Sequence, residues 1–262
     1  MIDIQAYVHC LKKLVNSCAN SSRQLLLGPL QPASLSDLVA VRSQFHPNVH
    51  GLLLNDLNRE GYQAMDVPSA VRLVSPAMMR CLCELVNGNV GVPAHPQLMG
   101  MYRFLRLVRR YLRIFMSPQV SQAQKVVDAA YVTTYLRRWR LWCKNTPEKT
   151  INENFVTEED MLDVVLSCHY AVLLMKLHKE ECADVELDLS RTGTDCCESY
   201  FSSLGSFVDN KRTYTCGEAL TTTRAQYRLL LLAGLGGVQR PKTKRDLPKW
   251  HDDETEVTCP TM

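Results

Sequence analysis

Two acidic residues, Asp195 and Glu198, have the type and spacing that could hold a metal ion. Carboxylates three positions apart lie on one face of a helix, and near the start of a helix the macrodipole favours their ionised form. The same spacing also fits a capping box, with Asp195 as the N-cap and Glu198 as the third helical residue. The pattern therefore predicts either a carboxylate metal site or a capped helix start, and it favours the cap.

A second candidate site is basic. Residues 101–144 contain ten Lys or Arg and one acid, a net charge of +9, whereas residues 145–200 carry a net −9. The helical period of 101–116 places five arginines on one face, and residues 135–142 interleave arginine with Tyr and Trp, a mixture that suits phosphate contact and base stacking. The candidate nucleic-acid-binding residues are Arg103, Arg106, Arg109, Arg110, Arg113, Arg137, Arg138 and Arg140.

The basic segment also has a simpler interpretation. Two adjacent segments of opposite charge could pack against each other, with the tryptophans in the core, and no nucleic acid would then be involved. The sequence leaves these two interpretations open.

The elements that would position these residues are helices, and the sequence shows neither an internal repeat nor sustained strand alternation. Apolar periodicity predicts helices over 4–18, 35–45, 101–116 and 161–179. Proline at the first helical position predicts three more helix starts, at Val67-Pro68, Ser75-Pro76 and Ser117-Pro118. We expect a mainly α, multi-helical fold with three parts: an N-terminal helical region (1–97), a helical region with the D-x-x-E block (98–232) and a disordered charged tail (233–262).

Composition narrows the class of protein. The chain of 262 residues is 46% hydrophobic and 22% charged, with a net charge of +3, as in ordinary soluble domains. It opens without the apolar stretch of a secretory signal, so we expect its eleven cysteines to be reduced and its location to be nuclear or cytoplasmic. Its longest apolar run is too short to span a bilayer, which predicts no membrane partner.

The D-x-x-E block also carries a family resemblance. The segment D-C-C-E-S-Y-F-S-S-L-G-S is similar to the C-terminal block of P-element-type (THAP-type) transposases, which has the pattern D-x-x-E-x-x-F-S-x-[IL]-R. Asp195, Glu198, Phe201, Ser202 and Leu204 match, and Gly205 stands where the family usually has Arg. Scattered similarity extends upstream to about residue 50.

The resemblance implies an RNase H-like transposase interrupted by a helical insertion, in which three acidic residues hold two Mg²⁺ ions for DNA strand cutting and joining. Glu198 would be the third acid, now vestigial, with Asp195 beside it as a further catalytic candidate. Upstream strands bearing the first two aspartates are not found, so we expect a transposase-like or domesticated-transposon fragment that is catalytically incomplete. It would be a DDE-type enzyme, with Mg²⁺ as cofactor, only if joined to that upstream half.

The second functional hypothesis is a non-catalytic α-helical module that binds nucleic acid or another protein. DNA is the partner that both hypotheses share.

Overall fold

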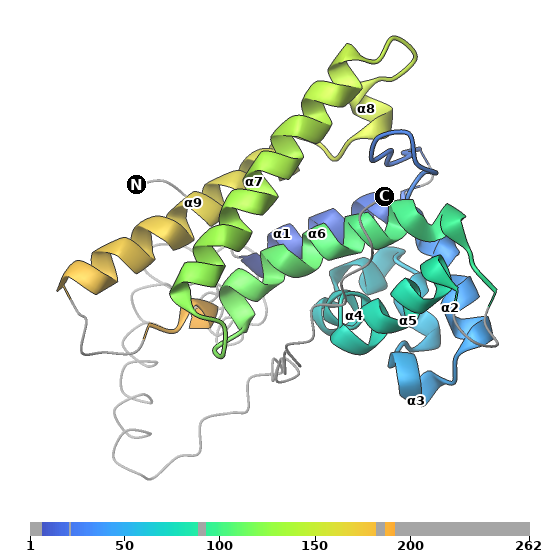
Figure 1. The fold of residues 1–262 in the computed structure, drawn as a ribbon, viewed down its shortest axis with the longest axis horizontal. Helices are drawn as coiled ribbons and strands as arrows, with labels where there is room; N and C mark the ends of the chain where they lie inside the picture. The colour runs from blue at the N-terminus through green and yellow to red at the C-terminus, as the bar shows by residue number, and fades with distance from the viewer. Residues whose placement is uncertain (1–6, 21, 89–92, 182–186, 192–262) are drawn as a thin grey trace, which may run out of the picture. The chain divides into compact units, whose positions relative to one another are not determined.

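The structure of the protein is a computed structural model that describes residues 7–20, 22–88, 93–181 and 187–191. Four long helices dominate this part of the chain: α1 (Tyr7–Ala19), α6 (Met99–Met116), α7 (Gln122–Asn145) and α9 (Glu158–Glu181). The described residues form no strand, only an isolated antiparallel bridge between Leu25 and Ala33. The expected mainly α fold is therefore confirmed, whereas the RNase H-like part of that expectation is not (Figure 1).

Shorter helices fill the first half of the chain. They are η1 (Leu35–Leu38), α2 (Val39–Gln44), α3 (Pro47–His50), η2 (Leu54–Leu57), η3 (Gly61–Met65), α4 (Val67–Leu73), α5 (Pro76–Asn87) and η4 (Pro96–Leu98). Two more, α8 (Ile151–Asn154) and η5 (Leu189–Arg191), flank α9. Figure 1 shows α2 to α5 gathered beside one end of α6.

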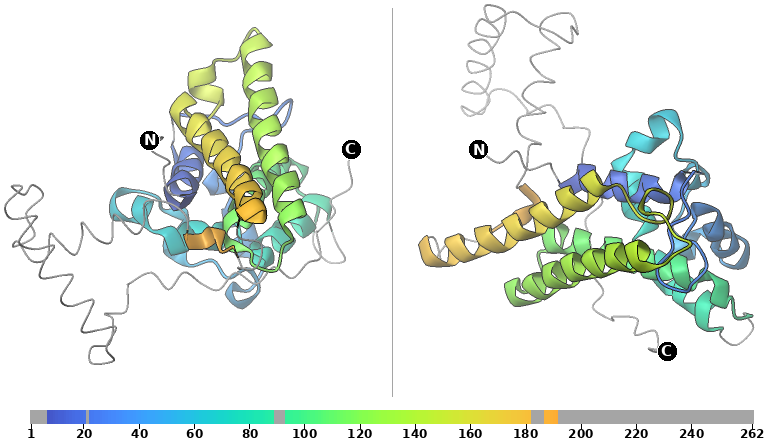
Figure 2. Two further views of the ribbon diagram at one scale, coloured as in Figure 1. Left: turned by 90° about the vertical axis from the view of Figure 1, so that its left-hand side faces the viewer. Right: turned by 90° about the horizontal axis from the view of Figure 1, so that it is seen from above.

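Helix α6 is the centre of the described fold. It contacts α1, α5, α7 and α9, and the two further views show α7 and α9 lying over the layer formed by α1 and α6 (Figure 2). Its apolar residues are almost completely buried, among them Phe104, Leu105, Val108, Tyr111 and Leu112. At its start, Gly100 lies so close to the loop before η1 that an added Cβ would meet the Gln31 carbonyl oxygen at 2.1 Å.

Polar side chains cap several of the helix starts. Ser34 and Asp37 form a capping box at η1, Ser75 caps α5, and Thr157 accepts a hydrogen bond from the Asp160 amide at the start of α9. These side chains satisfy amides that have no partner within the helix. The polar residues therefore fix the starts of η1, α5 and α9, whereas α4 and α6 begin without a side-chain cap.

One predicted start is wrong. Helix α7 begins after Ser121, whose hydroxyl accepts from the Gln124 amide, and not at Ser117-Pro118. Ser117 instead ends α6, because its amide donates to the Arg113 carbonyl, and Pro118 lies in the turn that reverses the chain. A proline suits a tight reversal as well as a helix start, and the sequence alone did not separate the two.

Residues far apart in sequence close the end of the bundle near α8. The Trp139 indole donates to the Leu26 carbonyl at 2.5 Å, and the Gln24 amide donates to the Glu153 carbonyl at 2.7 Å. The ring of Trp139 lies edge-on to Phe104 and Phe155. Trp139 is therefore in the core, whereas Trp142 is half-buried, so the interpretation that places both tryptophans in the core holds for Trp139 alone.

The helices on either side of residues 87–97 pack against each other, since α5 contacts α6 and the His95 amide donates to the Leu85 carbonyl at 2.7 Å. The three-part division expected from the sequence stays a prediction, and its second boundary, at 232, lies outside the described residues.

Candidate nucleic-acid interface

The acidic pair Asp195 and Glu198 lies outside the described residues, so its role as metal site or helix cap stays a prediction. Within the described part of the chain, no group of three His, Cys, Asp or Glu side chains is placed to hold a metal ion. The site that can be built from the structure is therefore the basic one.

Helices α6 and α7 form an antiparallel hairpin that brings the two halves of the basic segment together. Its register is fixed by three contacts: Arg113 with Asp128, Arg110 with Tyr131, and Phe104 with Trp139. Continuing that register places Arg106 and Arg103 level with the turn of α7 from Tyr135 to Arg138. We call this line of basic and aromatic side chains the α6–α7 seam; its members are Arg103, Arg106, Arg110, Arg113, Tyr131, Tyr135 and Arg138.

One buried carboxylate offsets part of the positive charge at the Arg110–Arg113 end of the seam. Asp128 accepts two hydrogen bonds from the Arg113 guanidinium, at 2.6 and 2.7 Å, and its Oδ1 lies 3.6 Å from Arg110. The Asp128 side chain is 0% exposed and those of Arg110 and Arg113 are 15% and 14% exposed. Bidentate geometry and burial make this a strong pair. These two arginines are therefore part of the packing between α6 and α7.

An aromatic pair lines the middle of the seam. Tyr131 and Tyr135, one helical turn apart on α7, stack with ring centroids 5.7 Å apart, and the Arg110 guanidinium lies 4.2 Å from the Tyr131 centroid. Burial raises the pKa of Tyr135 to about 12, an effect increased by Tyr131 and opposed by Arg103. Both rings are only partly exposed. Tyr131 is not among the residues predicted from the sequence. The feature that could have identified it is its spacing of four residues from Tyr135.

The other α6 arginines are half-buried as well. Arg103, Arg106 and Arg109 are all of intermediate exposure, and Arg109 donates to the Val74 carbonyl at 3.2 Å, at the end of α4. The five arginines thus do not form one open face.

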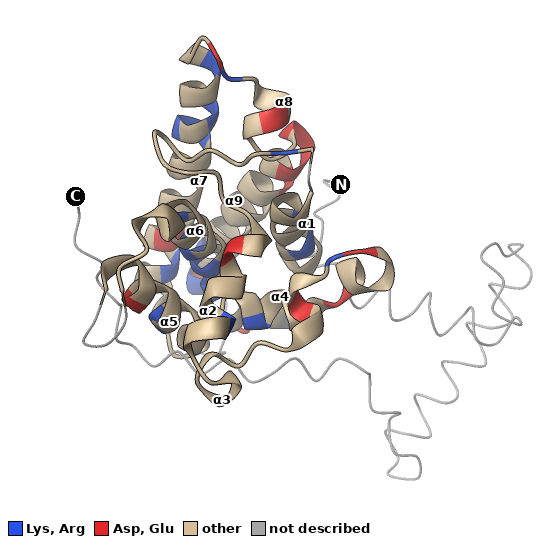
Figure 3. Ribbon diagram, turned by 90° about the vertical axis from the view of Figure 1, so that its right-hand side faces the viewer, with Lys and Arg blue, Asp and Glu red and all other residues tan. Residues whose placement is uncertain are grey.

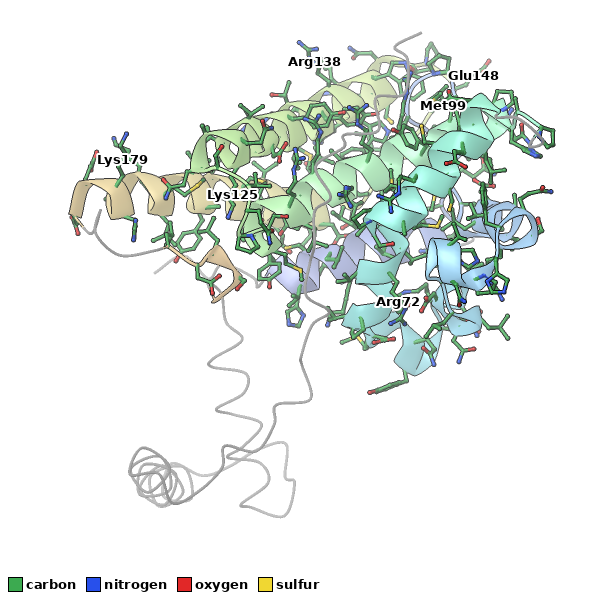
Figure 4. The ribbon with its side chains drawn as sticks, turned by 60° about the horizontal axis from the view of Figure 1, so that its bottom comes forward. Arg72, Met99, Lys125, Arg138, Glu148 and Lys179 are labelled. Atoms are coloured by element: carbon green, nitrogen blue, oxygen red, sulfur yellow. The ribbon has the colours of Figure 1, made fainter. Side chains whose placement is uncertain are left out.

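The end of the seam away from Asp128, which we call its open end, is formed by exposed residues of α7. Arg137 and Arg138 are exposed, as is Lys144 further along the helix, and Figure 4 shows Arg138 pointing outward from the bundle. Arg140 instead pairs with Glu158 at the start of α9, at 2.5 Å. Lys125 is 6% exposed, with its pKa lowered by burial and partly restored by Asp188. Arg137 and Arg138 are therefore the candidates that a phosphate could reach most directly.

The pairing of oppositely charged segments is partial. Arg140 and Glu158 join the basic segment to the acidic one, but Glu159, Asp160 and Asp163 surround Lys13 of α1, which donates to Asp163 at 2.9 Å. Figure 3 shows Lys and Arg along α6 and α7, and Asp and Glu along α8 and the start of α9. These acidic side chains therefore do not neutralise every basic residue at the exposed end of α7.

Helix α9 is long and apolar enough, by length and composition, to cross a membrane, a test that core helices of soluble proteins also meet. In this fold it packs against α1, α6 and α7.

Comparison with known proteins gives one relationship. No family model and no curated protein matches the sequence. Among solved structures, the chain is similar to the Drosophila P element transposase strand transfer complex, with a TM-score of 0.53 and 13% identity. The similarity covers 76% of this chain and 45% of that chain, so this chain spans less than half of the transposase. The likeness is one of fold, and the D-x-x-E block itself lies outside the described residues.

Proposed function

We propose that this chain is the helical part of a transposase-like protein and that it binds the backbone of DNA along the open end of the α6–α7 seam. The observation that carries the proposal is the register of the α6–α7 hairpin, which sets Arg103, Arg106 and the Tyr131–Tyr135 stack level with the exposed Arg138, next to the exposed Arg137 in the sequence.

Phosphate binding follows from the charge at this end of the hairpin. Each arginine that meets a phosphate releases condensed counterions, which makes the affinity fall steeply with salt. Tyr131 is already in contact with Arg110 and Tyr135, so an unpaired base would stack on the remaining face of Tyr135. Asp128 offsets part of the charge of Arg110 and Arg113 at the other end of the seam, so the binding site would be weighted toward Arg137 and Arg138.

The fold likeness to a transposase strand transfer complex supports DNA as the partner, but catalysis is a separate matter. Strand transfer would require Mg²⁺ held by several carboxylates, of which Glu198 and Asp195 are the candidates. We propose that the chain alone is catalytically incomplete and acts by binding.

The test is fluorescence anisotropy of the full chain with a labelled 30-base-pair duplex and the matching single strand, over a series of salt concentrations. Arg137→Ala with Arg138→Ala should weaken binding about tenfold at low salt. It should also lower the slope of log affinity against log salt by about 1.8, or about 0.9 for each lost phosphate contact.

The matched control removes the same charge elsewhere. Lys176→Ala with Lys179→Ala changes two exposed lysines of α9 and should leave the salt slope unchanged. Equal losses in the two double variants would show a non-specific charge effect, and the absence of binding at low salt would overturn the proposal.

A further inference from the structure

The outer face of α9 carries apolar side chains that the bundle leaves exposed. Leu162, Leu173 and Leu177 are 55%, 53% and 41% exposed, and the half-buried Leu166 and Tyr170 lie between them in sequence. Spacings of four, four, three and four residues place all five on one side of a helix. We call this set the α9 leucine stripe. The opposite side of α9 is the one packed in the core, through Val164, Val165, Cys168, Ala171 and Met175.

We propose that the α9 leucine stripe binds the same stripe of a second copy of this chain, in an antiparallel pair related by a two-fold axis. The spacing of the stripe is symmetric about the midpoint between His169 and Tyr170. Leu162 and Leu177 are equally far from that midpoint, and so are Leu166 and Leu173. A reversed copy would therefore present leucine to leucine at the outer two levels and Tyr170 to His169 at the centre, as a self-complementary two-fold interface requires.

Charge favours the antiparallel direction. The first turn of α9 contains three acids, Glu158, Glu159 and Asp160. The last turns mix Lys176 and Lys179 with two glutamates, and Lys176 lies 4.0 Å from Glu180. A parallel pair would set two acidic first turns side by side. An antiparallel pair about this midpoint sets Asp160 level with Lys179 and Asp163 level with Lys176, leaves Glu158 and Glu159 level with Glu181 and Glu180, and opposes the helix dipoles.

The length of the α9 leucine stripe determines how tightly two copies are expected to bind each other. From Leu162 to Leu177 the helix advances about 22 Å, at ~1.5 Å per residue. One helix face of this length buries less than the ~800 Å² per partner of a standard stable interface. We therefore expect a reversible dimer with a Kd on the order of 10 μM.

The first experiment is sedimentation velocity of the full chain from micromolar to about 100 μM. Leu166→Glu with Leu173→Glu should raise the Kd at least tenfold, because two charges enter the apolar contact on each copy. His169→Leu fills the polar gap in the exposed face of α9 and should lower the Kd about fivefold. The control is Leu141→Glu on α7, where the leucine is 56% exposed but off the stripe; its Kd should equal that of wild type.

The direction of pairing has its own test. His169→Cys lies beside the proposed axis and should form a disulfide-linked dimer on mild oxidation, whereas Leu162→Cys should not, because its counterpart lies at the far end of the partner helix. The wild type gives the background of the native cysteines, of which Cys10, Cys18, Cys81, Cys83, Cys143 and Cys168 are buried.

Three results would overturn the proposal. A chain that stays monomeric at 100 μM has no such interface, and cross-linking of Leu162→Cys to itself would mean a parallel pair. Binding of wild type, but not of the Leu166→Glu, Leu173→Glu variant, to phosphatidylcholine vesicles would make a bilayer the occupant of the stripe. Circular dichroism equal to that of wild type shows that each variant is folded.

Discussion

Helices α6 and α9 differ in how completely the bundle covers them. Both are long and rich in apolar residues, but α6 buries nearly all of its apolar residues, whereas α9 leaves Leu162, Leu173 and Leu177 exposed. The ion pairs that join the two helices to α7 also differ in burial. Arg113 of α6 pairs with the buried Asp128, whereas Glu158 of α9, which is 73% exposed, pairs with Arg140. The comparison shows that the bundle covers the apolar residues of α6 almost completely, whereas the described helices leave one apolar face of α9 uncovered.

The largest loss of stability should come from removing the buried ion pair between α6 and α7. Asp128→Asn leaves the half-buried Arg113 and Arg110 without their counter-charge and should lower the free energy of unfolding by about 3–5 kcal/mol. Glu158→Gln, the matched acid-to-amide change at the exposed ion pair, should cost less than about 1 kcal/mol. Urea unfolding followed by circular dichroism measures the free energy of unfolding of both variants. Similar losses in the two variants would contradict the difference between the buried and the exposed ion pair.

The second prediction compares one leucine on each helix. Leu112 of α6 is 0% exposed, and Leu112→Ala should cost about 2–5 kcal/mol because it removes buried methyl groups and leaves a cavity. Leu173→Ala on α9 should change the stability of the monomer by less than about 0.5 kcal/mol. The unfolding must be measured well below the Kd for self-association. A large loss for Leu173→Ala under those conditions would mean that its face is covered within the chain.

The smallest effect concerns the charged contact that ties the start of α9 to α1. Burial lowers the pKa of Lys13, but the hydrogen bond and charge of Asp163, with Asp160 and Glu159, outweigh it and raise the pKa above 10.5. A raised folded-state pKa contributes stability below the unfolded-state value and loses it as pH rises through the folded-state value. Lys13→Met should therefore cost up to about 1 kcal/mol at pH 7.

The same variant gives the pH test. The difference in unfolding free energy between wild type and Lys13→Met should shrink as the pH rises above 10.5, because wild type then loses the charge that the variant lacks. Comparing the two proteins at each pH cancels the ionisation of the tyrosines. A difference that stays constant to high pH would mean that Lys13 acts through packing of its hydrocarbon chain.

Much of the fold was predictable because helices are defined by local pattern. Val67-Pro68 and Ser75-Pro76 marked helix starts that the structure has, and the apolar period of 101–116 matches α6. The turn at Pro118 and the short helix α8 were missed, since each depends on how the chain must reverse between long helices. The role of Asp195 and Glu198 remains a prediction from spacing and resemblance.

The sequence by itself determined that this chain is helical and that its basic residues concentrate in α6 and α7, because periodicity and composition are properties of the chain alone. Only the tertiary structure decided what each face meets. It placed Asp128 against Arg113 and Arg110, so the expected open arginine face became partly interior, and it left Arg137, Arg138 and the α9 leucine stripe outside. A helical pattern defines which residues share a face, but the packing of other helices decides whether that face is covered.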